Sequence, residues 1–442
     1  MASNWTKQLF DVRKDEWPKA ILMALYFFFH ISTFWVLKPM KRGIIVDFYG
    51  ESNNLNLFGW MLSGPEVEQL AKVLNMVVAY VIVIIFTLMV RKISRQNLII
   101  VFCSVFSLFF ITYASVIQNL SDGIVWSFYI FGDMYNTAML ALFWAFMNDI
   151  VVADEAKRIY GIVGLGGVVG GFVGSTVVQA FVRSAGRSTL LLGLIVPMIV
   201  ISIIGVVVNK MVGQKEEKQA INTDNSENKS NAAIEGAKIV FSSKYLLAIA
   251  GIIGFYEIVS NIIDFQLSVT IAQSVAGGLD KDAYFGLVGQ ITGVASILIQ
   301  LFLTSYVMRK FGVGIALLFL PISILMGSVG FLFLPTLIFA VIMSASDNSL
   351  NYSINQSAKE ALYVPTTRDE KYKAKAFIDM FVQRFAKVIA VALNLAFAAY
   401  VSQTNVRWLS IISLLLLIFW VGIVRFAGRK FEDLTSVSAS TK

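Results

Sequence analysis

The chain has very few of the residues on which most enzyme and metal sites depend. Among its 442 residues there is one cysteine, Cys103, and one histidine, His30. A single cysteine, which here falls within an apolar run, cannot form a disulfide framework or a cysteine metal cluster. The sequence also has no nucleophile elbow and no phosphate-binding loop. We therefore predict that the protein is not an enzyme, has no catalytic residues, and needs neither a metal nor a cofactor.

Charged residues are scarce as well, and apolar residues are correspondingly abundant. Asp, Glu, Lys and Arg make up 14% of the chain, whereas hydrophobic residues make up 57%. A soluble domain of this length cannot hide so much apolar surface. The apolar residues form repeated runs of about 20 residues, which is long enough for a helix to cross the hydrocarbon layer. The composition therefore predicts an all-α integral membrane protein.

Basic residues concentrate in alternate loops between these runs. Examples are Lys157 and Arg158 after the fourth run, and Arg309 and Lys310 after the eighth. Cytoplasmic loops carry an excess of Lys and Arg, so both termini are expected in the cytoplasm, with the protein in the cell inner membrane. The net charge of +8 then needs no nucleic-acid partner. The expected partners are the lipid bilayer and a small anionic solute, and we expect a monomer. The twelve predicted transmembrane helices centre on residues 18–38, 70–90, 97–118, 124–148, 159–182, 188–211, 244–268, 283–307, 312–333, 336–357, 375–401 and 406–427.

A polar segment divides the chain nearly in half. Residues 214–238 read QKEEKQAINTDNSENKSNAAIEGAK, a composition typical of a linker. The loops on its two sides are weakly similar, since DEAKRIYG follows the fourth span and DEKYKAKAFID follows the tenth. This is the two-bundle (6+6) plan of major-facilitator transporters, whose substrate site lies between the bundles. We predict an N-terminal six-helix bundle (1–212), a cytoplasmic linker (213–240), a C-terminal six-helix bundle (241–430) and a cytoplasmic tail (431–442).

Glycine is concentrated in the fifth span, which reads YGIVGLGGVVGGFVGS. Gly167 and Gly171, and likewise Gly170 and Gly174, have the small-xxx-small spacing that lets two helix backbones approach closely. A dinucleotide fingerprint is not present, because Val169 stands where glycine or alanine is required. We therefore predict a packing role for these glycines.

The first span ends in FWVLKPMKRG, with three cations at Lys38, Lys41 and Arg42. A charge in hydrocarbon costs about 3 kcal/mol on insertion scales, so it requires a partner or water. In one interpretation the cations reach the lipid headgroups and Pro39 ends the helix. In the other they bind a substrate anion, because cations on the nominally outer side oppose the orientation rule. Asp133 of the fourth span lies among aromatic and apolar residues, and it needs a cation or a proton there.

The seventh and tenth spans carry acidic and amide residues. Glu257, Asn261 and Asp264 follow one another at steps of four and three, which places them on one helix face. Two carboxylates on one stripe repel each other, so one of them is suited to carry a proton. Alternatively, this end of the span is wet and Asp264 pairs with a loop lysine. In the tenth span, Asp347 and Asn348 begin a polar stretch that is expected to line a cavity.

The eleventh span begins in a basic loop and carries charges into an apolar helix. Lys375 and Asp379 are i,i+4 neighbours, and Arg384 and Lys387 are i,i+3 neighbours deeper in the helix. These cations bind an anionic substrate, or they have a structural role and pair with Asp347 or Asp264. The sequence alone does not decide between the two roles.

Residues 359–387 contain LYVPTTRDEKYKAKAFIDMFVQRFAK, which resembles the loop-and-helix motif of the ATP/ADP translocase family of intracellular bacteria and plastids. FWVLKPMKRG, GDMYN with LFWAFMND, EAKRIYGIVGLGGVVGG and YEIVSNIIDF are similar to that family's motifs in the first, fourth, fifth and seventh spans. The resemblance implies nucleotide exchange or import. It places the family's important membrane charges on Lys41, Asp133, Asp264 and either Lys375 or Lys387.

The sequence differs from the family pattern at several positions. Its acidic residues are aspartates where glutamates are usual, and Pro39 and Arg42 stand where the first motif usually has acids. Phe265 and Gln266 stand where tryptophan and lysine are usual, which removes one cation from the expected phosphate site.

Three hypotheses follow. The first is an alternating-access transporter of nucleotides or a related organic phosphate, working by exchange or by proton symport. The second is a proton-coupled transporter of another organic solute, with Glu257, Asp264 and Asp347 as the proton path. The third is a membrane sensor or assembly protein that does not transport. Under the first hypothesis the expected substrate-binding residues are Lys38, Lys41, Arg42, Asn348, Lys375, Arg384 and Lys387, and the expected proton carriers or state-dependent ion pairs are Asp133, Glu257, Asp264, Asp347 and Asp379.

Overall fold

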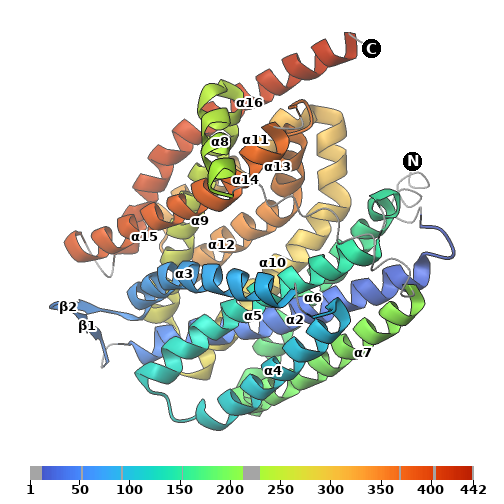
Figure 1. Ribbon diagram of the computed structural model, residues 1–442. Helices are drawn as coiled ribbons and strands as arrows, with labels where there is room; N and C mark the ends of the chain where they lie inside the picture. The colour runs from blue at the N-terminus through green and yellow to red at the C-terminus, as the bar shows by residue number, and fades with distance from the viewer. Residues whose placement is uncertain are drawn as a thin grey trace. The chain divides into compact units, whose positions relative to one another are not determined.

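The structure is a computed structural model, and the part of the chain that it describes is almost entirely helical (Figure 1). It describes residues 12–50, 53–90, 93–151, 153–212, 229–367, 370–401 and 405–440. Residues 213–228 of the predicted linker and residues 441–442 of the predicted tail lie outside the described residues. The chain divides into two compact units. Unit 1 comprises Met1–Asp224 and Val275–Gly293, and unit 2 comprises Asn225–Ser274 and Val294–Lys442.

Unit 1 consists of long helices and one short antiparallel hairpin. In the hairpin, Leu55 of one strand lies opposite Leu62 of the other, and Gly59 takes a left-handed conformation (φ 89°) at the turn. The elements are α2 (Trp17–Phe48), β1 (Leu55–Leu57), β2 (Trp60–Leu62), α3 (Gly64–Val90), α4 (Arg95–Val116), α5 (Asp122–Ile150), α6 (Ala153–Gly193), α7 (Ile195–Val212) and the first part of α10 (Leu279–Leu298).

Helix α2 is the centre of unit 1, because it packs against α3, α5, α6 and α7. Its closest neighbour is the glycine-rich helix α6. A Cβ atom added at Gly166, Gly170 or Gly174 would overlap a backbone carbonyl of α2, so only glycine fits at these positions. The packing role predicted for the glycines of the fifth span is thereby confirmed. The helix also passes through Pro39 without ending there, since α2 continues to Phe48.

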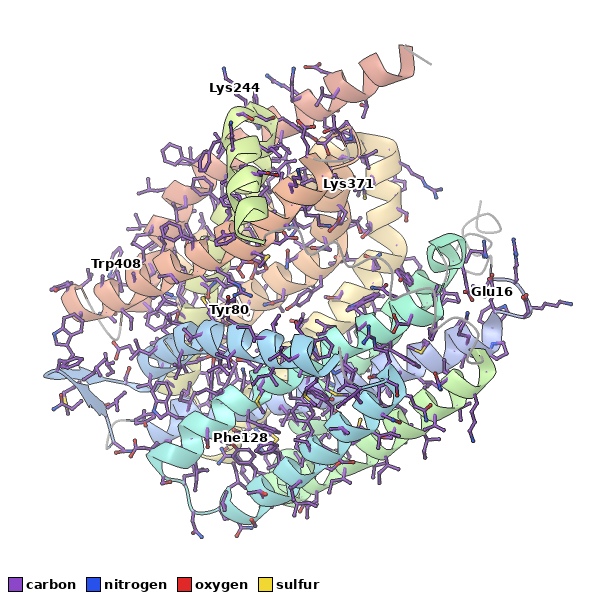
Figure 2. All side chains as sticks on the ribbon, in the orientation of Figure 1. Glu16, Tyr80, Phe128, Lys244, Lys371 and Trp408 are labelled. Carbon is purple, nitrogen blue, oxygen red and sulfur yellow. The ribbon has the colours of Figure 1, made fainter. Side chains whose placement is uncertain are left out.

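Aromatic side chains fix α5 against α4. Phe110 and Tyr113 of α4 pack on Phe131 of α5, with ring centroids 5.6 and 5.0 Å apart. Phe128, labelled in Figure 2, lies 5.1 Å from Tyr113 in the same group. Each such pair contributes about 0.5–1.5 kcal/mol beyond simple burial. The group therefore holds α5 in a fixed rotation, which determines where the next turn places Asp133.

The start of α10 is bound to unit 1 by charge. Residues 280–282 read Asp-Lys-Asp, and each of the three pairs with a different residue. Asp282 is fully buried and accepts two hydrogen bonds from Arg187. This network accounts for the assignment of Val275–Gly293 to unit 1. The pairs are Arg183–Asp280 at 2.5 Å, Asp47–Lys281 at 3.2 Å and Arg187–Asp282 at 2.6 Å.

Unit 2 is also built around its first long helix. Helix α9 packs against α8, α12, α15 and α16. Several helices of this unit contain π-helical turns, which widen the backbone locally and often occur at functional sites. The elements are α8 (Lys229–Ser242), α9 (Lys244–Ser274), the π-turn η2 (Ile299–Thr304), α11 (Ser305–Phe333), α12 (Leu337–Leu350), the π-turn η3 (Asn351–Asn355), α13 (Gln356–Leu362), the π-turn η4 (Glu370–Ala374), α14 (Lys375–Phe377), the π-turn η5 (Ile378–Val382), α15 (Gln383–Tyr400), the 3₁₀ turn η6 (Val406–Trp408) and α16 (Leu409–Ser440).

Within the described residues, seven helical segments are long and apolar enough to cross a membrane. The protein is therefore a multi-pass membrane protein, as the composition predicts. Two of the seven segments, Arg158–Met211 and Leu279–Phe333, are 54 and 55 residues long. Each contains a glycine with non-helical backbone angles, at Gly186 (φ 77°) and Gly312 (φ 82°), where the helix direction changes.

The residue before α2 is tied to α6 by a bidentate ion pair. Arg158 donates from Nε (3.0 Å) and from Nη2 (2.5 Å) to the two carboxylate oxygens of Glu16. These hydrogen bonds lower the pKa of Glu16 from 4.5 to about 2. Because the folded-state pKa is depressed, the pair stabilises the fold fully above pH 4.5 and loses this effect as the pH falls toward 2.

We predict that Glu16→Gln lowers the melting temperature of the purified protein at pH 7 by about 1–3 °C, as expected for one ion pair near the surface. The difference from wild type should shrink as the pH falls below 4.5. Asp15→Asn is the matched control, because Asp15 is the adjacent acid and is exposed. A Glu16→Gln protein that melts at the wild-type temperature at pH 7 would contradict this prediction.

Candidate functional site

Two consecutive cations of the first-span motif are buried. Lys41 is 5% exposed and Arg42 is 8% exposed. Because α2 continues past Pro39, both project from a helix and not from a terminal loop. The interpretation in which they reach the lipid headgroups is therefore wrong for these two residues. A buried cation requires a counter-charge and hydrogen-bond acceptors, and each of the two has an acidic partner.

Lys41 pairs with Asp133, as the depth of that aspartate in the fourth span required. Its Nζ forms an ion pair with Oδ1 of Asp133 on α5, and Nδ2 of Asn75 on α3 donates to Oδ2. The ammonium also lies 4.3 Å from the ring centroid of Tyr129, which is one helical turn from Asp133. Gly132 leaves room for the lysine stem, because a Cβ there would lie 3.0 Å from Lys41 Cδ. Side chains of three helices thus meet at this ion pair.

Arg42 pairs with a residue that the sequence analysis did not select. Its Nε donates to Oε1 of Glu68 on α3 at 2.7 Å, and Glu68 is fully buried. Nζ of Lys72 lies 3.7 Å from the same oxygen. The guanidinium of Arg42 also stacks 4.4 Å from the ring centroid of Phe285. One carboxylate therefore lies between two cations.

Three polar residues of α3 at this site lie on one helix face. Glu68, Lys72 and Asn75 are spaced by four and three residues, the spacing that aligns side chains along a helix. The predicted second span, 70–90, does not include Glu68. The spacing was the available signal, and it was not used. The third cation of the motif, Lys38, is half-buried, with its ammonium 4.4 Å from the ring centroid of Trp35.

In unit 2, one of the two acids of the predicted seventh span, Glu257, pairs with a lysine of the predicted eleventh span. Glu257 on α9 is 5% exposed. Lys387 of α15 places Nζ 3.5 Å from Oε2 of Glu257, and Gln383 donates from Nε2 to Oε1. The expected structural partners of Lys387 were Asp347 and Asp264, whereas the structure pairs it with Glu257. The side chain of Lys387 remains 40% exposed, so this pair is more open than the pairs of unit 1.

Asp347 is the most deeply buried of the predicted acids in unit 2, at 1% exposed. Ser260 of α9 donates from Oγ to Oδ2 at 2.6 Å. The other carboxylate oxygen, Oδ1, has no hydrogen-bond partner among the described residues. The neighbouring Asn348 donates within its own helix, to the carbonyl of Ser344 at 2.9 Å. Asp347 therefore has one oxygen that is able to take a proton or a hydrogen bond.

The remaining predicted residues of unit 2 are distributed along its helices. Asp264 is half-buried on α9. Asn261, one turn before it, accepts at its backbone oxygen a hydrogen bond from Asn394 of α15 at 3.3 Å. Asp379 and Arg384 are both exposed, and the structure does not place them with the buried pairs described above.

At the start of α14, Lys375 pairs with Glu360 at 2.6 Å, and both side chains are partly exposed. A cation that was not among the predicted site residues, Lys359, lies 3.4 Å from Oδ1 of Asn351 and 5.3 Å from the ring centroid of Tyr256. It brings a positive charge beside the π-turn η3. Among the described residues, no group of three or more His, Cys, Asp or Glu is placed to hold a metal ion.

Buried cations paired with carboxylates in a multi-pass helical fold are typical of a secondary transporter. Solved structures support the fold. The nucleoside transporter NupG is 9% identical in sequence, with a TM-score of 0.61 over 94% of this chain and 99% of that one. A bacterial homologue of the human lysosomal transporter Spinster is 11% identical, with a TM-score of 0.60 over 96% and 98% of the two chains. The fold is thus of the major-facilitator type.

The family model described as TLC ATP/ADP transporter matches residues 1–125 and 123–431. The chain belongs to this family, and the resemblance seen in its motifs is confirmed. A relative from Chlamydia pneumoniae, named ADP,ATP carrier protein 1, is 24% identical over 86% of this chain and 84% of that one. The chloroplastic ADP,ATP carrier protein 1 of Arabidopsis thaliana is 23% identical over 97% and 76% of the two chains. These relatives are carriers and not enzymes.

The pairing of Lys41 with Asp133 predicts strong coupling in a double-mutant cycle. Lys41→Gln and Asp133→Asn should each destabilise the protein by about 2–3 kcal/mol, because each leaves one charge buried without its partner. The double variant should be more stable than the sum of the two losses predicts. Thermal unfolding of the four proteins in detergent measures this coupling. Strictly additive losses would show that the two side chains do not form a pair.

Proposed function

We propose that the protein is a nucleotide transporter that moves ATP, ADP or a related organic phosphate across the cell inner membrane by alternating access. Membership of the TLC ATP/ADP transporter family supports the substrate class. The observation that carries the proposal is the pair of buried cations, Lys41 and Arg42, on the central helix of unit 1. A phosphate chain carries several negative charges, and charge-assisted hydrogen bonds to such cations are about twice as strong as neutral ones.

The carboxylates that hold these cations are proposed to act as exchangeable partners. Asp133 forms an ion pair with Lys41. A substrate phosphate would compete for the ammonium group, and Asp133 would then be held by Asn75, which already donates to it. A cation that changes partners between states gives a ligand differential affinity for those states, which alternating access requires. Lys38 is proposed as a further contact for the anion.

In unit 2, Glu257 and Lys387 are proposed as a state-dependent pair, and Asp347 and Asp264 as proton carriers. The free oxygen of Asp347 supports a proton-carrying role. Exchange of one nucleotide for another requires no proton, whereas net uptake against a gradient does. Asn348, Lys375 and Arg384 are proposed as substrate contacts, and Asp379 as an ion-pair partner.

We also propose that the chain crosses the membrane twelve times, in two bundles of six, with both termini in the cytoplasm. The two segments of 54 and 55 residues are each about twice as long as one crossing requires. Gly186 and Gly312 are suitable points of division. Three further stretches, 122–150, 337–362 and 370–400, are long enough to cross but carry more polar residues.

Transport by reconstituted protein tests the function. Purified protein in vesicles loaded with ADP should take up labelled ATP, and empty vesicles should take up much less if the mode is exchange. Stimulation of uptake into empty vesicles by an acidic exterior would indicate proton symport instead. If no nucleotide enters under any of these conditions, the proposed function is wrong.

The Lys41 site offers a test that leaves every charge in place. Gly132→Ala adds a methyl group 3.0 Å from Lys41 Cδ, so the lysine stem must shift by a few tenths of an ångström. We expect the apparent affinity for nucleotide to fall by about 3- to 10-fold, equivalent to about 0.7–1.4 kcal/mol. Gly123→Ala, on the same helix, meets no atom within 4 Å and should behave as wild type. Equal KM values for the two variants would contradict the assignment of Lys41 to the substrate site.

A further inference from the structure

Glu68 is the most completely buried acid of the unit 1 site, and its surroundings are unusual. Its side chain is 0% exposed, compared with 21% for Asp133. One of its oxygens, Oε1, lies 2.7 Å from Nε of Arg42 and 3.7 Å from Nζ of Lys72. A guanidinium and an ammonium thus converge on a single oxygen. Converging cations of these two kinds also form typical protein binding sites for a phosphate group.

We infer that Glu68 occupies the place of a substrate phosphate group when the site is empty, and that Lys72 is a third cation of the phosphate-binding site. This inference rests on the proposed function and adds two residues to it. The anion that enters would take Arg42 from Glu68 and would share Lys72 with it. The ligand class is a compound with a diphosphate or triphosphate chain, because Lys41 and Arg42 are adjacent on α2 and hold separate carboxylates.

The energetic reason for such a residue is the cost of leaving buried cations unpaired. Removing one partner of a buried ion pair is strongly destabilising, and a site without Glu68 would leave the Arg42 guanidinium without this carboxylate. With Glu68 present, the net binding free energy of the substrate is the free energy of its own contacts with the cations minus that of the Glu68 contacts it displaces. A transporter requires this limit, because a substrate that binds too tightly is released slowly. Glu68 therefore lowers affinity and raises turnover.

Glu68 can leave Arg42 without becoming isolated. Lys72 is one helical turn further along α3, at the i+4 position, so both move with the same helix. A small rotation of the glutamate side chain retains one contact while the phosphate approaches the guanidinium. The Arg42 guanidinium also stacks on the ring of Phe285, a contact that does not depend on Glu68. The exchange of partners therefore requires no unpaired intermediate.

A purely structural role is the alternative. In that case Glu68 joins α2 to α3, and its loss weakens the fold without improving the binding of any anion. The two roles predict opposite changes in affinity. A structural link predicts an unchanged or higher KM together with a lower melting temperature. A phosphate substitute predicts a lower KM, because its competition with the substrate has been removed.

The test compares Glu68→Gln with Glu66→Gln in proteoliposomes loaded with ADP. Glu66 lies one helical half-turn earlier on α3 and accepts hydrogen bonds from the backbone N and Oγ of Ser63, at 2.6 and 2.9 Å, so it is a matched control outside the cation pairs. For Glu68→Gln we expect the KM for labelled ATP to fall about 5- to 20-fold, with a lower maximal rate. Lys72→Gln should raise the KM. Glu66→Gln should change neither quantity by more than about twofold.

An unchanged or higher KM in a Glu68→Gln protein that folds overturns the inference, whether or not its melting temperature is lowered. If Glu68→Gln does not fold, Glu68→Asp replaces it as the test variant. This substitution keeps the negative charge but moves it one methylene away from the cations, so it should also lower the KM. Stabilisation of each protein by inorganic pyrophosphate, measured by thermal unfolding, gives a readout independent of transport. Wild-type protein that transports no nucleotide refutes the proposed function. Tighter pyrophosphate binding by Glu68→Gln would still support the Glu68 inference in that case.

Discussion

A buried cation at membrane depth must have a counter-charge beside it, and this requirement organises unit 1. Lys41 and Arg42 are consecutive residues of α2, and each pairs with a carboxylate on a different helix. Lys41 pairs with Asp133 on α5, and Arg42 pairs with Glu68 on α3. The two ion pairs therefore fix the positions of three helices as well as neutralising the charges. A substitution that removes one carboxylate affects both folding and binding, so variants that conserve charge and shape are the informative ones.

In unit 2 the buried charges are less completely paired than in unit 1. The side chain of Lys387, which pairs with Glu257, is 40% exposed, and one oxygen of Asp347 has no partner among the described residues. An unsatisfied buried polar group is costly, so such a group gains free energy by taking up a proton or a new partner. The π-helical turns beside them, in α12–α13 and before α15, provide backbone that can change its hydrogen bonding. Under the proposed function, unit 1 holds the anion and unit 2 changes its protonation or ion pairing.

The sequence predicted charged residues that conflict with the pattern around them. Lys41 stood out because it belongs to a group of cations on the nominally outer side, and Asp133 because it lies among aromatic and apolar residues, and the structure joins the two. Glu68 and Lys72 did not stand out, because they lie at the edge of a hydropathy window, where charges are common. Pro39 was read as a helix end in one interpretation, but a proline can be accommodated inside a membrane helix when neighbouring groups satisfy the freed carbonyl. A hydropathy profile indicates whether a residue lies within a membrane span. It does not indicate which residue of another helix will be its partner, because that depends on tertiary packing.

The central claim is that the buried cations of α2 exchange carboxylate partners for substrate phosphate. A structure of the protein with bound ADP, determined in a lipid nanodisc, tests it most directly. The account predicts phosphate oxygens about 3 Å from Lys41 Nζ and from the guanidinium of Arg42, with Glu68 or Asp133 displaced from its cation. ADP bound elsewhere, with the Lys41–Asp133 and Arg42–Glu68 pairs both intact, would contradict it.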